Sequence, residues 1–102
     1  MGKMRTYFVG KLFDINYRMA THEGDAKRRL ASEAVKILLL PSSEVPESYR
    51  IQFLKLRALI EDSLQKAPIK GLTHRNLGHI HNSTAVKYIK LLLAIQGDLH
   101  NE

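Results

Sequence analysis

Three consecutive basic residues, Lys27, Arg28 and Arg29, form the longest run of like-charged side chains in this chain of 102 residues. Lysine and arginine donate charge-assisted hydrogen bonds to carboxylates and phosphates, so such a run can bind an anion. The run also lies where we expect the first turn of a helix, and the helix dipole disfavours cations there. Acidic residues on either side offset part of the charge. A solvated helix face is therefore the alternative interpretation, and we prefer it.

Histidine is the other residue type that could hold a ligand, because imidazole binds Zn²⁺ and Ni²⁺ readily. The nearest grouping is His74, His79 and His81. The chain has no cysteine, this grouping has no carboxylate beside it, and no two histidines are four residues apart within one expected helix. The sequence therefore predicts no metal site, and polar side chains lining a turn are the preferred interpretation.

The sequence contains no recognisable catalytic motif. No serine has a Gly-x-Ser-x-Gly setting, and the chain has no glycine-rich phosphate loop. Glu61 and Asp62 are adjacent, so on a helix they point to different faces and do not make a carboxylate pair. We expect a protein that is not an enzyme, and the sequence indicates no cofactor and no small-molecule ligand.

Apolar residues recur at helical spacing along most of the chain. Asp25 is the expected N-cap of one helix, Pro41 ends that helix, and Gly97 is the expected end of the last one. We predict a compact all-α bundle of four or five helices in one domain, residues 1–102, with frayed ends at about 1–3 and 98–102. The expected helices span residues 4–19, Ala26–Leu40, Glu47–Lys66, Thr73–His79 and Thr84–Gln96.

Two of these helices carry a further interpretation. Residues 5–9 also suit a strand, because β-branched and aromatic residues occur there, but the apolar stripe continues to Met19 and favours a helix. The segment Glu47–Lys66 has a second apolar flank in addition to its main stripe. We therefore expect it to be the central packing helix, buried by neighbours on two sides. The flank consists of Ile51, Leu54, Ala58 and Leu59.

Composition narrows the class of partner. The net charge is +6, and the excess lies toward both ends of the chain and is absent from its middle. A basic chain attracts anionic partners without specificity. The longest apolar runs, Ile37–Leu40 and Leu91–Ile95, are far shorter than the roughly 20 residues that span a bilayer. We see no signal peptide, and we expect a cytoplasmic protein that does not bind a membrane.

Residues 72–93 resemble the helix-turn-helix DNA-binding domains of bacterial regulators. The resemblance is carried by Leu-Thr-x-x-x-Leu-Gly at Leu72–Gly78 and by Asn-Ser-Thr-Ala-Val-Lys-Tyr-Ile-Lys-Leu-Leu at Asn82–Leu92. It covers about a fifth of the chain, and the spacing from Leu77 to Val86 is shorter than in the usual motif. The last two helices would then form a helix-turn-helix-like hairpin.

The resemblance implies a role for each polar residue of this segment. The second helix of such a motif enters the major groove, where Asn82, Ser83, Thr84 and Lys87 would meet base edges. Three basic residues, Lys70, Arg75 and Lys90, would neutralise phosphates. Val86, Ile89 and Leu93 would face the first helix of the motif. A structural hairpin that reads no DNA is the alternative.

Two hypotheses of function therefore remain open. The first hypothesis is a small nucleic-acid-binding protein that uses its last two helices on duplex DNA, with support from Lys27, Arg28 and Arg29. Alternatively it is a protein-interaction or dimerisation module, with a homodimer or another protein as its partner. The apolar face of residues 49–64 and the run Leu91–Ile95 motivate that second hypothesis.

Overall fold

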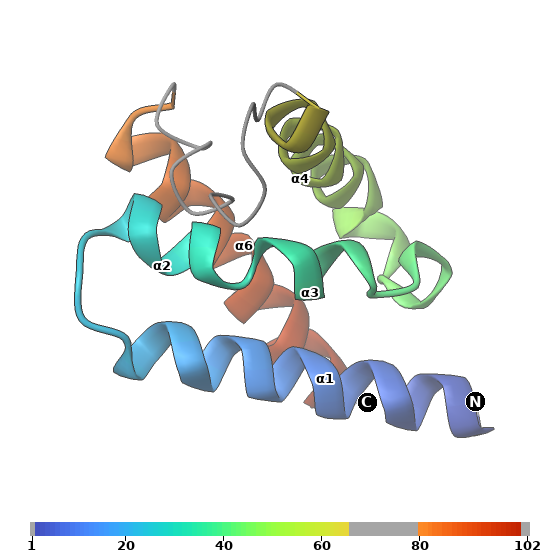
Figure 1. The fold of residues 1–102 in the computed structure, drawn as a ribbon. Helices are drawn as coiled ribbons and strands as arrows, with labels where there is room; N and C mark the ends of the chain where they lie inside the picture. Colours follow the sequence, from blue (N-terminus) through green and yellow to red (C-terminus); the bar gives the residue numbers. More distant parts are fainter. Residues whose placement is uncertain (1, 66–79, 101–102) are drawn as a thin grey trace.

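The computed structural model describes residues 2–65 and 80–100 of the chain, and within these residues the protein is helical and contains no strand (Figure 1). The prediction of an all-α bundle is confirmed. The elements are α1 (Gly2–Thr21), α2 (Ala26–Ser32), α3 (Ala34–Leu38), the 3-10 turn η1 (Ser42–Glu44), α4 (Glu47–Gln65) and α6 (Asn82–His100). The expected helix Thr73–His79 lies outside the described residues.

The first helix forms where the apolar stripe predicted it, and the strand alternative over residues 5–9 is wrong. Phe8, Leu12, Ile15 and Met19 are buried at spacings of four, three and four residues, so they share one face of α1. This face packs on α2, α3 and α6. Arg5 at its start donates from Nε to Glu44 Oε1 at 2.8 Å, which joins α1 to η1.

The segment Ala26–Leu40 was expected to be one helix, and the structure divides it at Glu33 into α2 and α3. The Ser32 hydroxyl donates to the Arg29 carbonyl at 2.8 Å, and the Glu33 N–H donates to the Leu30 carbonyl three residues back. Such short bonds compete with the regular helical pattern. The Glu33 side chain turns into the protein, where it accepts from Arg18 Nε at 2.9 Å. The break therefore brings a buried carboxylate against α1.

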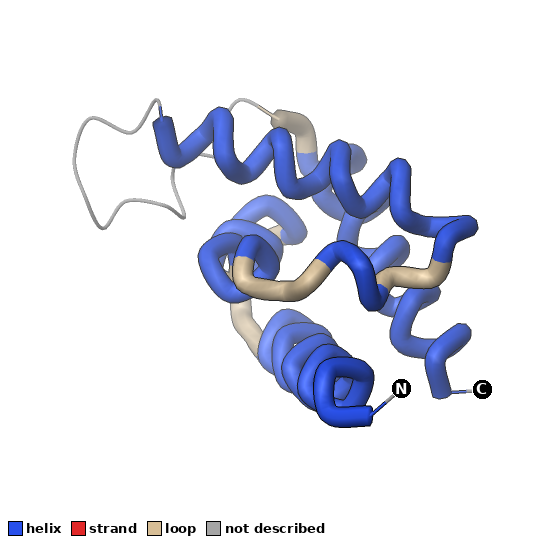
Figure 2. Tube along the Cα trace, turned by 90° about the vertical axis from the view of Figure 1, so that its right-hand side faces the viewer, coloured by secondary structure: helices blue, strands red, loops and turns tan. Residues whose placement is uncertain are grey.

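The central helix is α6, and the expectation that Glu47–Lys66 would be central is wrong. α6 packs against α1, α2 and α4, and its contacts with other described elements are the most extensive in the protein. It is also the most apolar of the three long helices. Figure 1 shows it crossing the bundle behind α1 and α2, and Figure 2 shows the same helices turned by 90°. Its buried face consists of Ala85, Leu92, Ile95 and Leu99.

The fourth helix is buried on one side only. Phe53, Leu56 and Ile60 lie in the core, whereas Ile51 is 70% exposed and Leu54 is 45% exposed. The expected second apolar flank therefore faces solvent. The flank is apolar, as the sequence shows, but helical periodicity alone does not determine whether another helix packs against it.

The last helix is longer than predicted. It runs from Asn82 to His100 and passes through Gly97, which was expected to end it. Residues 98–100 are helical and do not form a loose tail. Val86, Ile89 and Leu93 were expected to face the first helix of the motif, which lies outside the described residues; Val86 and Leu93 are 39% and 50% exposed, and Ile89 is half-buried.

The orientation of α6 gives a stability prediction for two adjacent leucines, one buried and one exposed. We expect Leu92→Ala to lower the free energy of unfolding by about 2–5 kcal/mol, because Leu92 is fully buried and its removal leaves a cavity. Leu93→Ala is the control and should cost less than about 0.5 kcal/mol, since half of that side chain is in solvent. Urea unfolding followed by circular dichroism measures both. Equal losses would contradict the orientation of α6.

Candidate functional site

The N-terminal end of α6 is where the helix-turn-helix resemblance placed the DNA contacts. The helix begins at Asn82, and the His81 carbonyl accepts from the N–H groups of Thr84 and Ala85 at 3.0 and 3.1 Å. Asn82 and Ser83 are exposed, and Thr84 is half-buried. Lys70 and Arg75, the other residues predicted to contact DNA around this helix, lie outside the described residues.

Both polar groups of the Asn82 side chain already have partners in the protein. Its Oδ1 accepts from the backbone N–H of Lys27 at 3.0 Å, and its Nδ2 donates to Asp25 Oδ2 at 3.4 Å. Asn82 therefore caps the start of α2 from across the fold and joins it to the start of α6. Reading adenine requires the same oxygen and nitrogen, so these contacts argue against Asn82 as a base-reading residue.

Asp25 is the N-cap of α2, as the sequence predicted. Its Oδ1 accepts from the Arg28 N–H at 3.0 Å. This bond lowers the pKa of the Asp25 carboxyl below its ordinary value, although desolvation opposes the shift; Asn82 and the charges of Lys27 and Arg28 also lower it. A carboxylate thus sits among the cations that were expected to bind an anion.

The basic run of α2 is spread over different surroundings. Arg28 is exposed, whereas Lys27 and Arg29 are half-buried. Arg29 Nε donates to the Gly24 carbonyl at 3.0 Å, in a turn where Gly24 has a φ of 125°, a conformation that suits glycine. Each residue of the run therefore forms a hydrogen bond within the protein, through the backbone N–H of Lys27 and Arg28 and through the side chain of Arg29.

Lys87 and Lys90 are the predicted cations of α6, and both are exposed to solvent. Both are exposed on the outer side of α6, near the exposed Ser83. Lys87 Nζ lies 6.0 Å from the centroid of the Tyr88 ring. These residues can meet an anionic surface without any rearrangement of the helix.

Exposed apolar side chains occur in pairs at helical spacing. Each pair shares one helix face. Scattered exposed apolar residues need no explanation, but contiguous patches mark binding surfaces. The pairs are Phe13 with Tyr17, Val35 with Leu39, Ile51 with Leu54, and Val86 with Leu93.

One of these pairs borders a groove between α1 and α6, which run in opposite directions. A hollow of about 560 Å³ lies between the first half of α1 and the end of α6, lined among others by Val9, Phe13 and His100. A second hollow of about 250 Å³ follows along the same two helices and is lined among others by Ala20 and Leu93. We refer to the two hollows together as the α1–α6 groove.

The floor of this groove is held by Asn16, which is 5% exposed. Its Nδ2 donates to the Leu92 carbonyl at 3.2 Å and to Gln96 Oε1 at 2.6 Å. Its Oδ1 is buried and has no hydrogen-bond partner. These bonds fix the register of α1 on α6, so the groove is a preformed feature of the helix pair.

An exposed aromatic pair lies at the groove: Phe13 lines the larger hollow, and Tyr17, which lines neither hollow, packs against it. The Phe13 and Tyr17 rings stack with centroids 6.4 Å apart and an interplanar angle of 15°, and both rings are more than half exposed. They lie one helical turn apart on the solvent side of α1. The signal was present in the sequence, because both lie off the buried stripe of this helix.

Neither a metal site nor a membrane-spanning helix is found in the described part of the chain. Within the described part of the chain, no group of three or more histidine, aspartate or glutamate residues could hold a metal ion; His74 and His79 lie outside it. No helix of that part is long and apolar enough to cross a membrane. The chain matches no family model, no curated protein and no solved structure.

The Asp25 cap gives a prediction of pH dependence. Because the folded protein holds the pKa of Asp25 below its unfolded value, the carboxylate stabilises the fold at neutral pH, and this contribution is lost as pH falls below about 4. Asp25→Ala should therefore lower the melting temperature at about pH 7, and the difference from wild type should shrink toward about pH 3. Glu23→Ala, which removes an exposed carboxylate two residues earlier, is the control. A difference that is constant over this range would contradict the assignment.

Proposed function

We propose that this protein is a helical protein-interaction module, and that the α1–α6 groove receives an acidic amphipathic helix of a partner. The observation that supports this proposal is that large apolar side chains are exposed beside the two hollows. The exposed fractions are 53% for Phe13, 62% for Tyr17 and 50% for Leu93. Amphipathic helices bind such grooves with apolar anchors at helical spacing.

The energetic argument rests on the aromatic pair. Burying a large apolar side chain contributes about 1.5–3 kcal/mol, and aromatic residues are frequent among the few residues that dominate an interface. The stacked rings already restrict each other, so binding orders them at a smaller entropic cost. Phe13 and Tyr17 are therefore the expected anchors.

The charge around the groove favours an acidic partner. Lys11 and His100 line the larger hollow and Arg29 lines the smaller one, whereas Asp14 is the single acidic residue among the side chains that line them. Complementary charge raises the association rate and selects the partner. The overall charge of +6 acts in the same direction.

A designed peptide tests the proposal directly. We would measure fluorescence anisotropy of an amphipathic helical peptide with a leucine face and a glutamate face, together with a second peptide in which lysine replaces every glutamate. The acidic peptide should bind more tightly. Phe13→Ala/Tyr17→Ala should weaken its binding by about tenfold or more, as expected for the loss of anchor residues.

The matched control is Ile51→Ala/Leu54→Ala, which removes an exposed apolar pair from α4. This variant should bind the acidic peptide as wild type does. Equal affinity for both peptides, or equal loss in the two double variants, would overturn the proposal. Sedimentation of the wild type at high concentration measures its oligomeric state, and a dimer would indicate that a second copy of the chain fills the groove.

Binding of duplex DNA through α6 is a second candidate, favoured by the exposure of Lys87 and Lys90 on one side of that helix. With these two cations as its phosphate contacts, the binding would be electrostatic and largely independent of sequence. Asn82 would position α2 and would not read a base.

Anisotropy of random duplex DNA at about 50 and about 200 mM salt tests this candidate. Binding should fall steeply with salt, and Lys87→Ala/Lys90→Ala should weaken it and reduce the salt dependence. Lys55→Ala removes an exposed lysine of α4 and serves as the control. No binding at the lower salt concentration would exclude the candidate.

A further inference from the structure

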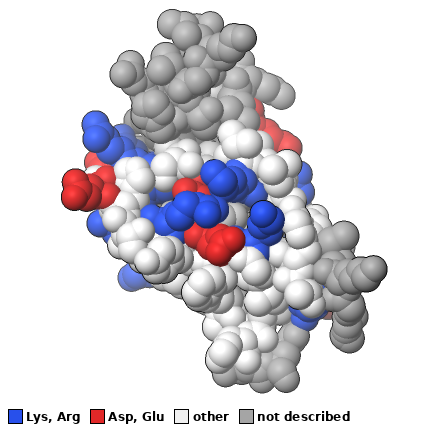
Figure 3. Space-filling view, turned by 60° about the horizontal axis from the view of Figure 1, so that its bottom comes forward, with Lys and Arg blue, Asp and Glu red and all other residues white. Residues whose placement is uncertain are grey.

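A separate cleft lies on the other flank of α1, where this helix faces α3. It has a volume of about 200 Å³ and combines basic side chains with an apolar floor. Figure 3 looks at this side of the molecule and shows Lys and Arg side chains gathered near its middle, with acidic side chains among them. The cleft shares Tyr7, Lys11 and Asp14 with the larger hollow of the α1–α6 groove, whereas Arg18, Lys36 and Leu39 line the cleft and neither hollow of the groove.

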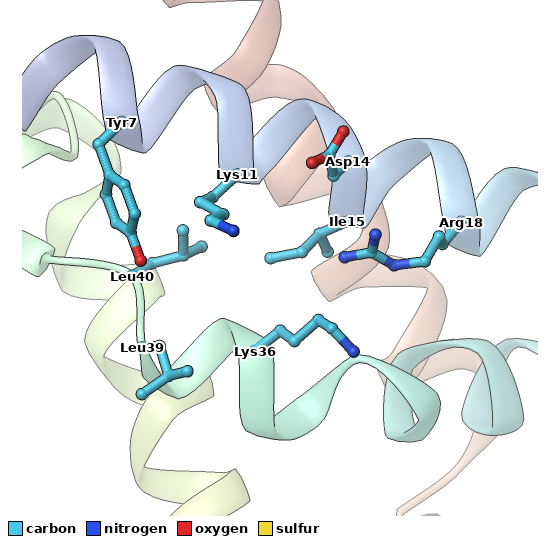
Figure 4. Close-up of a pocket in the computed structure, with 8 residues that line it drawn as sticks. All are labelled: Tyr7, Lys11, Asp14, Ile15, Arg18, Lys36, Leu39 and Leu40. Atoms are coloured by element: carbon cyan, nitrogen blue, oxygen red, sulfur yellow. The ribbon is translucent and has the colours of Figure 1, made fainter.

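Three cations from two helices surround the cleft. Lys11 and Arg18 are seven residues apart on α1, which places them two turns apart on one face, and Lys36 comes from α3. Figure 4 shows the side-chain nitrogens of all three directed into or along the space between the helices, whereas the Asp14 carboxylate points away from it. The arrangement concentrates positive charge in one small volume.

The side-chain nitrogens of these cations can donate hydrogen bonds to a ligand in the cleft. Arg18 Nε donates to Glu33 Oε1 at 2.9 Å, and Glu33 is 4% exposed, so this bond fixes the guanidinium while its terminal nitrogens face the cleft. Lys11 Nζ lies 5.7 Å from the centroid of the Tyr7 ring. Within the described residues, no carboxylate forms an ion pair with Lys11 or Lys36.

The remaining lining of the cleft is apolar. Ile15 and Leu40 lie beneath the cations and are 1% and 2% exposed, and the Tyr7 ring forms one end. Leu39 and Tyr7 also line the cleft and are 67% and 46% exposed, so an occupant with an apolar body would bury part of their surface. An occupant must therefore combine a negative charge with a compact apolar group.

We propose that this cleft binds a small organic monocarboxylate with an apolar body. The three cations are opposed by Asp14 and Glu33, which leaves one net positive charge and favours a monoanion over a phosphate dianion. The volume is below the roughly 300–1,000 Å³ of pockets for drug-sized ligands, so the ligand is small. A free acid and the C-terminal carboxylate of a peptide share this chemistry.

Nuclear magnetic resonance titration with phenylacetate tests the site, and phenylacetamide is the neutral control of the same shape. Phenylacetate should shift the backbone amide signals of Tyr7, Lys36 and Leu40, and phenylacetamide should not. Lys36→Gln should weaken phenylacetate binding by about tenfold or more, because it removes a charge-assisted hydrogen bond. Lys55→Gln, which changes an exposed lysine of α4 that does not line the cleft, should leave the affinity unchanged.

Short peptides that end in leucine, with a free or an amidated C-terminus, separate the two sources of the carboxylate. Tighter binding of the free-ended peptide than of phenylacetate assigns the cleft to a chain end, and the reverse assigns it to a free acid. Equal binding of phenylacetamide, equal binding of inorganic phosphate, or an unchanged affinity in Lys36→Gln would overturn the proposal. Lys36 does not line the α1–α6 groove, so this result is independent of the proposed function.

Discussion

Leu92 and Ile95 of α6 are fully buried where this helix meets α1, α2 and α4, and the arrangement of the other helices depends on that packing. Ala85 lies in the same buried face, and its small side chain allows another helix to approach closely. Two side-chain contacts then set the position of α6. Asn16 donates to its backbone near the middle, and Asn82 accepts from the start of α2 at its N-terminal end. Every surface that we consider for binding is positioned by this central helix or by α1, which packs on it.

The sequence predicted what depends on local pattern. The stripe Phe8 to Met19, the Asp25 cap and the end of a helix before Pro41 all follow from spacing or from local hydrogen bonding, and all three are present. The break at Glu33 was missed, because its cause includes a bond to Arg18 that is distant in sequence. The role of Asn82 was missed for the same reason, since its partners lie 55 and 57 residues away. Periodicity also left open which apolar flank of α4 would find a neighbour, because that depends on the path of the whole chain.

Carboxylates determine which of the many basic side chains remain available. Glu44 binds Arg5, Glu33 binds Arg18, and Asp25 lies among the first residues of α2. The net charge of +6 is therefore not spread evenly over the surface that a partner meets. Among the described residues, exposed lysines occur in pairs at two places, with Lys11 and Lys36 beside α1 and α3, and Lys87 and Lys90 on α6, and Lys55 is exposed on α4. Each place carries few charges, so apolar contacts must supply much of the affinity for any specific partner.

The central helix also follows the other described helices in the chain, and this order has a consequence during synthesis. A ribosome adds about 5–20 residues per second, and the segments of α1 to α4 are synthesised before α6. During that interval the buried faces of α1 and α2 have no helix to cover them, and the first turn of α2 lacks the Asn82 oxygen. The nascent chain exposes apolar surface until its last helix emerges. Its yield in a cell should therefore depend on chaperones that hold unfinished chains.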